Sequence, residues 1–144
     1  MTAKEYLNQL RVIDRKICNL LLEKESIWTM LTRTTTPYDK DRVQASSNGD
    51  LKDECMDRLK ELEETIDYET DKLIDKRATI FNQINTLSNY QSIDILYQHY
   101  VQMKPLTDIA NASFYSYAWV KELHATALQD FERTYPNLLL NVLL

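Results

Sequence analysis

Apolar side chains recur alternately four and three residues apart along the start of the chain, and this feature constrains the fold more than any other. The spacing is that of a coiled-coil seam, so a helix here needs an apolar partner helix along its length. A single Gly and three Pro in 144 residues agree with long helices joined by few tight turns. The sequence therefore predicts an all-α protein. The seam positions, one of which is polar, are Tyr6, Leu10, Ile13, Ile17, Leu20, Lys24, Ile27 and Leu31, and the stripe is widened by Leu7, Leu21 and Trp28.

A second apolar stripe follows a segment in which the periodicity stops. Residues 34–50 are rich in turn formers and are expected to form a long loop, either with a specific contact role or disordered. Asp50 is expected to cap the second helix. Residues 1–33 carry a formal charge of +2 and residues 51–87 one of −4, so the two helices should attract each other. We expect a long antiparallel, coiled-coil-like helical hairpin over residues 1–87. The second stripe comprises Leu51, Cys55, Leu59, Leu62, Ile66, Leu73, Ile80, Ile84 and Leu87.

Two local patterns refine the expected hairpin. T-A-K-E at residues 2–5 is a capping box, in which the Thr2 hydroxyl and the Glu5 carboxylate can each satisfy a free backbone N–H at a helix start. In the second helix Glu69, Leu73 and Arg77 follow one another at intervals of four and four, which predicts a stutter in the heptad phase. The seam should therefore unwind locally near Leu73.

Residues 88–135 are predicted to form a three-helix unit after the hairpin. Residues 88–90 break the long helix, and a third amphipathic helix then leads into two further helices. Ser116 is well suited to cap the last of them by accepting a hydrogen bond from the backbone of Trp119 or its neighbour. That helix should start near Tyr117. The inward-facing apolar positions are Ile93, Leu96, Tyr97, Tyr100 and Val101 in the third helix, Leu106, Ile109 and Ala110 in the next, and Val120, Leu123, Ala127 and Phe131 in the last.

This unit resembles region four of bacterial sigma factors in IDILYQHYVQMKPLTDIA and, after a turn, YSYAWVKELHATAL, although Phe114 stands where sigma-like turns usually carry Gly. The whole chain also looks like a family of small phage and prophage proteins that are similar to late-transcription regulators, on the residues KEYLNQL, DRVQASS and YSYAWVKELHATAL. The resemblance implies a helix-turn-helix whose second helix lies in the DNA major groove. With Val120 and Ala127 committed to the core, helical geometry turns the other face of that helix outward. The expected DNA-binding residues are Ser116, Tyr117, Ala118, Lys121, Glu122 and Ala125.

Charge separates two hypotheses about this unit. The chain has a formal charge of −5, and residues 88–144 carry three basic and five acidic side chains. Few cations are therefore present there to bind phosphates. Hydroxyls, amides and free helix N–H groups can still contact a phosphate. The first hypothesis is a phage- or prophage-type transcription regulator whose helix-turn-helix contacts DNA, RNA polymerase or both. The alternative is a protein-protein interaction module that binds no DNA and uses the hairpin and the hydrophobic tail.

The tail, residues 136–144, is strongly apolar and is expected to dock on the hairpin or on a second copy of itself. A homodimer could therefore form through the hairpin or through residues 137–144. The tail is too short to span a bilayer, and the first thirty residues lack the apolar core of a secretory signal, so no membrane partner is expected.

The sequence carries no set of residues that would support catalysis, and no enzyme activity, metal or cofactor is expected. His99 and His124 lie in amphipathic helices, where a packed or surface histidine is the simplest interpretation. Cys18 and Cys55 should lie about 18 Å apart in the expected hairpin, far beyond the reach of a disulfide. Unpaired cysteines are typical of a reducing, cytoplasmic location.

Overall fold

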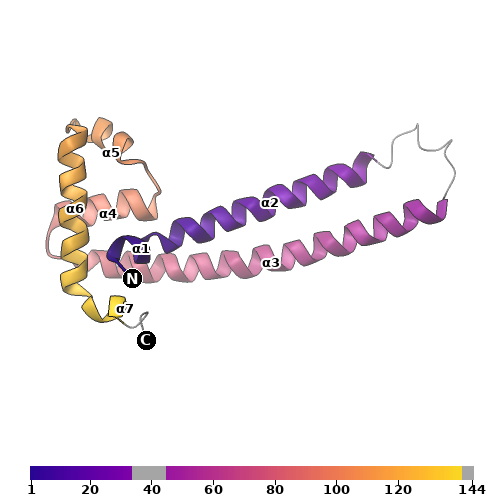
Figure 1. The fold of residues 1–144 in the computed structure, drawn as a ribbon, viewed down its shortest axis with the longest axis horizontal. Helices are drawn as coiled ribbons and strands as arrows, with labels where there is room; N and C mark the ends of the chain where they lie inside the picture. The colour runs from indigo at the N-terminus through magenta and orange to yellow at the C-terminus, as the bar shows by residue number, and fades with distance from the viewer. Residues whose placement is uncertain (34–44, 141–144) are drawn as a thin grey trace. The chain divides into compact units, whose positions relative to one another are not determined.

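The computed structural model describes residues 1–33 and 45–140, and every regular element in these ranges is a helix (Figure 1). The predicted all-α class is confirmed. Residues 34–44 of the expected loop and residues 141–144 of the tail lie outside the described ranges. The elements are α1 (Ala3–Leu7), α2 (Gln9–Arg33), α3 (Ala45–Asn85), α4 (Tyr90–Leu96), the π-helical segment η2 (Tyr97–Val101), α5 (Leu106–Ser113), α6 (Tyr117–Thr134) and α7 (Pro136–Leu140).

The chain divides into two compact units. Unit 1 comprises Met1–Ile13 and Leu73–Leu144, and unit 2 comprises Asp14–Lys72. The expected division into residues 1–87 and 88–135 does not coincide with these units. The reason is that apolar side chains from both ends of the expected hairpin, such as Leu7 and Ile84, belong to the same core as those of α4, α5 and α6.

Unit 2 consists of antiparallel segments of α2 and α3, which run side by side in Figure 1. Nζ of Lys16 lies 2.8 Å from Oε1 of Glu69, and Nζ of Lys24 lies 3.2 Å from Oε1 of Glu63, so residue numbers fall on one helix as they rise on the other. The expected attraction between the two helices thus takes the form of cross-helix ion pairs. The buried core is small: Ile27, Cys55, Leu59 and Leu62, with Leu20 and Leu31 packed against it.

Three expectations about unit 2 are wrong. Leu21 and Trp28 do not widen the buried stripe, because both are about half exposed. Asp50 does not cap the second helix and residues 45–50 are not part of a loop, because α3 begins at Ala45 and already includes them. A formed helix gains a backbone hydrogen bond for each residue it adds, so it can extend through weak helix formers such as Gly49, which costs about 1 kcal/mol relative to Ala.

Both cysteines of the chain are free, Cys18 exposed and Cys55 buried.

Glu69 is a buried carboxylate in this seam. Its Oε1 accepts a hydrogen bond from Lys16, whereas its Oε2 is buried without a partner. The hydrogen bond from Lys16, together with the nearby charges of Lys16 and Lys72, lowers the pKa of Glu69 against the opposing effect of burial. Glu69 is therefore ionised, paired and incompletely hydrogen-bonded.

Replacing Glu69 with Leu should raise the melting temperature of the protein. A buried ion pair is often no more stabilising than a hydrophobic side chain of similar volume, and Lys16 would be left in water because its side chain is 57% exposed. Thermal unfolding followed by circular dichroism measures the effect. Glu64→Leu, at an exposed position of the same helix, is the control and should bring no such gain. A lower melting temperature for Glu69→Leu would contradict the expectation.

In unit 1, the other elements are arranged around α6, which contacts α1, α4, α5 and α7. Phe131 is fully buried, and its ring lies 5.8 Å from the ring of Tyr6 and 5.2 Å from that of Tyr135, measured between centroids. These side chains hold α6 in the middle of the core. The buried apolar residues are Ala3, Tyr6, Leu7, Leu10, Ile80, Ile84, Leu87, Ile95, Leu96, Tyr100, Val101, Ile109, Ala110, Val120, Ala127 and Phe131.

Polar contacts fix the neighbours of α6. The hydroxyl of Ser92, buried on α4, donates to Oδ2 of Asp130 at 2.6 Å, and Nη2 of Arg133 donates to Oδ1 of the same carboxylate at 2.7 Å. The hydroxyl of Tyr6 donates to Oε1 of Gln83 at 2.7 Å. Because a buried polar group is costly without a partner, these bonds favour one arrangement of α1, α3, α4 and α6 within the unit.

The ends of two helices differ from the expectation. The capping box of Thr2 and Glu5 is confirmed, but the helix it starts ends at Leu7, and α2 follows after Asn8. Asn8 has ψ of −9°, short of the usual helical value, and its N–H donates to the carbonyls of Lys4 and Tyr6. The break after α3 spans residues 86–89 instead of 88–90, and Asn89 caps α4 by accepting from the N–H of Gln91 at 3.0 Å.

The expected stutter near Leu73 is wrong. It required Arg77 to take the inward position four residues after Leu73, but Arg77 is exposed and Lys76 is half-buried in its place. The intervals from Glu69 to Ile80 are then four, three and four, the regular heptad rhythm. The long aliphatic stem of a lysine can lie along an apolar seam while its ammonium reaches water, which explains how Lys76 occupies that position.

The described part of the tail docks within unit 1. Leu138 and Leu139 on α7 are half-buried and pack against the core of that unit. The hydroxyls of Thr86 and Tyr135, just before α7, form a short hydrogen bond. These two leucines therefore pack against their own chain.

Candidate functional site

The candidate site is the turn between α5 and α6 with the first turns of α6. Phe114 ends α5 in the left-handed conformation, with φ 60° and ψ 26°, and the N–H of Tyr115 donates to the carbonyl of Ala110 at 3.1 Å. The Ser116 hydroxyl accepts from the backbone N–H of Trp119 at 3.2 Å, and α6 starts at Tyr117. The predicted cap and helix start are confirmed. The cap uses one of the free N–H groups at this helix end and leaves others open to solvent.

One face of α6 packs in the core of unit 1, and the other face is exposed to solvent. Val120, Ala127 and Phe131 are buried and Leu123 is half-buried, as the spacing predicts. The remaining positions near the start of the helix are consequently available to a partner. All six residues predicted for the site are exposed: Ser116, Tyr117, Ala118, Lys121, Glu122 and Ala125.

The electrostatics of this face are weak. Lys121 lies over the ring of Tyr117, with Nζ 4.8 Å from the ring centroid, so the ring holds the ammonium close to the start of α6. Glu122 follows directly and offsets that charge. Unit 1 as a whole has seven basic and seven acidic side chains, a formal charge of zero, and the charge of −5 belongs to unit 2. The face is therefore not a general polyanion surface.

Sequence reasoning missed an aromatic patch beside these residues, formed by Phe114, Tyr115 and Trp119 together with Tyr117. Phe114 is 96% exposed, and the other three are 44% to 48% exposed. A signal was available, because FYSYAW at 114–119 holds four aromatics in six positions. Such side chains are enriched in the buried centres of interfaces. Tyr115 also borders a hollow of about 330 Å³ that includes Gln91, Asp94 and Gln98 of the α4–η2 segment.

His99 and His124 form a polar cluster with Tyr100 on the inner side of unit 1. Nε2 of His124 lies 2.7 Å from the Tyr100 hydroxyl, and the two imidazole centroids are 5.1 Å apart. Nδ1 of His99 donates to the carbonyl of Lys104 at 2.7 Å, while Nη2 of Arg11 donates to the carbonyl of His99 at 3.1 Å. Both histidines of unit 1 are packed, as predicted.

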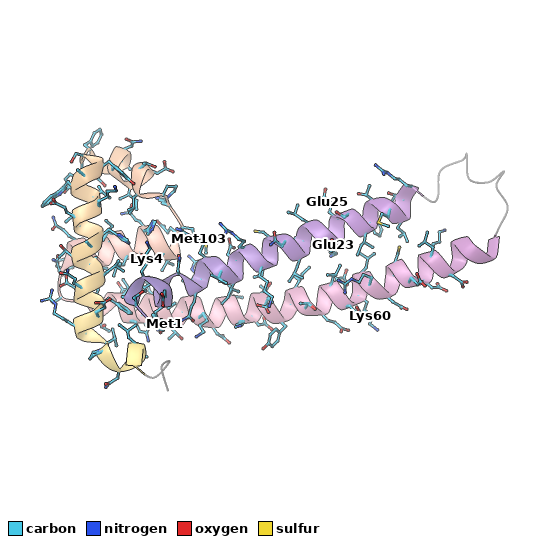
Figure 2. The ribbon with its side chains drawn as sticks, viewed as in Figure 1. Met1, Lys4, Glu23, Glu25, Lys60 and Met103 are labelled. Atoms are coloured by element: carbon cyan, nitrogen blue, oxygen red, sulfur yellow. The ribbon has the colours of Figure 1, made fainter. Side chains whose placement is uncertain are left out.

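Burial governs the protonation of this cluster. Burial lowers the pKa of His124 to about 4, and the electrostatic interactions with His99 and Lys4 act in the same direction. Lys4 is labelled in Figure 2. Burial also lowers the pKa of His99 and raises the pKa of Tyr100 to about 12. All three groups are neutral at pH 7. Among the described residues, no cluster of three or more His, Cys, Asp or Glu side chains could hold a metal ion.

No family model, curated protein or solved structure matches this chain. Within residues 1–33 and 45–140, no helix is both long enough and apolar enough to cross a membrane. The fold and the site thus define the protein as all-α, with an exposed polar and aromatic surface at the turn between two packed helices.

Proposed function

We propose that the protein is a phage- or prophage-type transcription regulator of the cytoplasm, in which a coiled-coil-like hairpin precedes a sigma-region-four-like helix-turn-helix. In this proposal α5 and α6 are the helix-turn-helix and contact DNA, RNA polymerase or both. The observation that carries it is the capped start of α6, where six exposed residues lie opposite the face buried through Val120 and Ala127. A recognition helix uses this division, because its N-terminal residues must reach base edges while its other face stays packed.

The exposed side chains suit a limited set of DNA contacts. Ser116 and the free N–H groups at the start of α6 can bind a phosphate. Tyr117 can contact a phosphate or a thymine methyl, Lys121 can reach guanine or a phosphate, and Glu122 can accept from the amino group of cytosine. The small Ala118 and Ala125 would allow a close approach to the groove. One cation is few for this task, so base contacts or a polymerase must supply part of the affinity.

Binding to DNA should be weak on random duplex, with a shallow dependence on salt. Each phosphate contact contributes a slope of about −0.9 in log affinity against log salt, and this face supports about one to three such contacts. Lys121→Ala should weaken binding to the native promoter region and reduce the slope by about one. Glu122→Ala should strengthen binding to random duplex or relax sequence preference. Fluorescence anisotropy with labelled DNA at several salt concentrations measures both effects.

Arg77→Ala is the matched control, because it removes an exposed cation from α3 in the same unit. It should leave the affinity and slope near those of the parent. The DNA contact is refuted if the native region binds no better than random duplex and neither α6 substitution alters binding when RNA polymerase is present.

A second candidate function is a protein interaction module without DNA contact. The observation that favours it is the aromatic patch, because Phe114 adds nothing to the core and exposed Trp and Tyr side chains are typical anchors of protein interfaces. Purification from the native host, scored for DNA against polymerase subunits, separates the two functions. Recovery of a protein partner that Trp119→Ala abolishes and Lys121→Ala leaves intact would support the interaction module.

A further inference from the structure

Unit 2 has an open apolar groove between its two helices. The groove has a volume of about 760 Å³, and its apolar lining includes Leu21 and Trp28 of α2 and Met56 of α3. Each of these three side chains is about half exposed: 48%, 54% and 53%. Leu21 and Trp28 are seven residues apart, so they repeat at one heptad position and form a line along the groove. Exposed apolar side chains gathered in a groove mark a surface that other chains cover.

The buried core of unit 2 is small, so the exposed apolar side chains of the groove matter for the stability of the unit. Ile27, Cys55, Leu59 and Leu62 are its only buried apolar side chains among the described residues of the unit. A single two-helix seam buries little surface relative to chain length, and small helical units usually gain stability from further packing. Covering Trp28, Leu21 and Met56 would give these two helices a second apolar layer.

The charges at the rim of the groove favour one kind of occupant. Lys24 and Lys60 are basic, whereas Glu25, Asp57 and Glu63 are acidic. Lys24 pairs with Glu63 at 3.2 Å. Lys60, Glu25 and Asp57 have no ion pair within the described ranges 1–33 and 45–140, and Figure 2 labels Glu25 on α2 and Lys60 on α3. The rim thus offers unpaired charges of both signs.

A surface that carries charges of both signs can be complementary to the same surface of a second copy. In a two-fold symmetric dimer the same patch lies on both sides, so a patch of a single sign would repel itself, whereas a mixed patch can pair. Lys60 of one copy can meet an acidic rim residue of the other. A strongly basic or strongly acidic partner would instead face repulsion from part of the rim. The rim charges therefore favour a second copy of this chain as the occupant.

We propose that two copies of the chain associate through this groove, with α2 and α3 of each packing into a four-helix bundle and Trp28 at its centre. Trp and Met are enriched in interface cores, and a two-fold symmetric pairing of helical hairpins is a common bundle arrangement. The proposal is independent of what α5 and α6 bind.

The test is the mass of the full chain in solution. Sedimentation velocity over a wide range of concentrations should give twice the chain mass of 17.0 kDa for the parent. Trp28→Glu should weaken association at least tenfold, because the substitution places a carboxylate at the centre of the apolar layer. Trp28 is exposed in the single chain, so its replacement should leave the helical circular dichroism unchanged.

Leu22→Glu is the matched control, because Leu22 is an exposed apolar residue of the same helix that does not line the groove. It should keep the mass of the parent. A Trp119→Phe background leaves Trp28 as the only tryptophan, and its emission should shift to shorter wavelength as the dimer forms. A parent that is monomeric at every concentration would overturn the proposal. So would a dimer that survives Trp28→Glu, or one that only deletion of residues 137–144 dissociates.

Discussion

Phe131→Ala should lower the free energy of unfolding by about 3 to 5 kcal/mol, the usual cost of truncating a buried Phe. The side chain is fully buried near the C-terminal end of α6, and its ring packs between those of Tyr6 and Tyr135. Truncation leaves a cavity where α1, α6 and the residues before α7 meet. Urea unfolding of the parent and the variant, followed by circular dichroism, measures the difference.

Gln129→Ala is the control for helix propensity, since it places the same residue type at an exposed position two residues away on α6. Its free energy of unfolding should stay within about 0.5 kcal/mol of the parent. If Phe131→Ala behaves like Gln129→Ala, then Phe131 does not lie in the core of unit 1 and the arrangement around α6 is wrong.

Lowering the pH from 7 to 5 should reduce the free energy of unfolding by about 2 kcal/mol through His124. The folded-state pKa is about 4 because of burial, whereas the unfolded value is about 6.5, so between these values the unfolded chain binds a proton that the folded chain excludes. Stability is complete above pH 6.5 and falls as the pH drops. His99, whose pKa is also lowered, acts in the same direction. Urea unfolding at a series of pH values gives the slope.

His124→Gln removes the titrating group while keeping a polar side chain near the Tyr100 hydroxyl. Its loss of stability between pH 7 and 5 should be smaller than that of the parent by most of the 2 kcal/mol. Burial notwithstanding, the Lys16 hydrogen bond lowers the pKa of Glu69, so the titration of that carboxyl lies mostly below this window. Equal slopes for parent and variant would show that His124 is already protonated or exposed in the folded protein.

Regular apolar spacing predicted the parts of the fold that depend only on local geometry. Leu10 and Ile27 are buried where the heptad pattern placed them, and Val120, Ala127 and Phe131 fix the orientation of α6. Capping chemistry at Thr2 and Ser116 was also predictable, because a side-chain oxygen and its backbone donor lie within one helical turn. Exposure of Lys121 and Glu122 followed from the same periodicity.

Features that depend on distant parts of the chain were not predictable from local patterns. Hydrophobicity alone placed Leu21 and Trp28 in the stripe, but a two-helix seam is too narrow to bury them. The grouping of Leu7 with Ile84 and Phe131 in one core depends on segments far apart in sequence. The aromatic patch was missed because Phe114, Tyr115 and Trp119 fall outside the apolar spacing of the helices, so the periodicity assigned them no surface; the structure leaves the Phe114 ring 96% exposed at the turn.

The π-helical segment η2 also affects how related sequences should be aligned with this chain. Its closing bond, from the N–H of Gln102 to the carbonyl of Tyr97 at 3.0 Å, spans five residues instead of four, which is the geometry left by inserting one residue into an α-helix. A chain of this kind lacking that residue would rotate everything that follows by about 100° around the helix axis. Related sequences should therefore be aligned through η2 with a one-residue gap allowed, because an ungapped comparison would assign the wrong residues to the core.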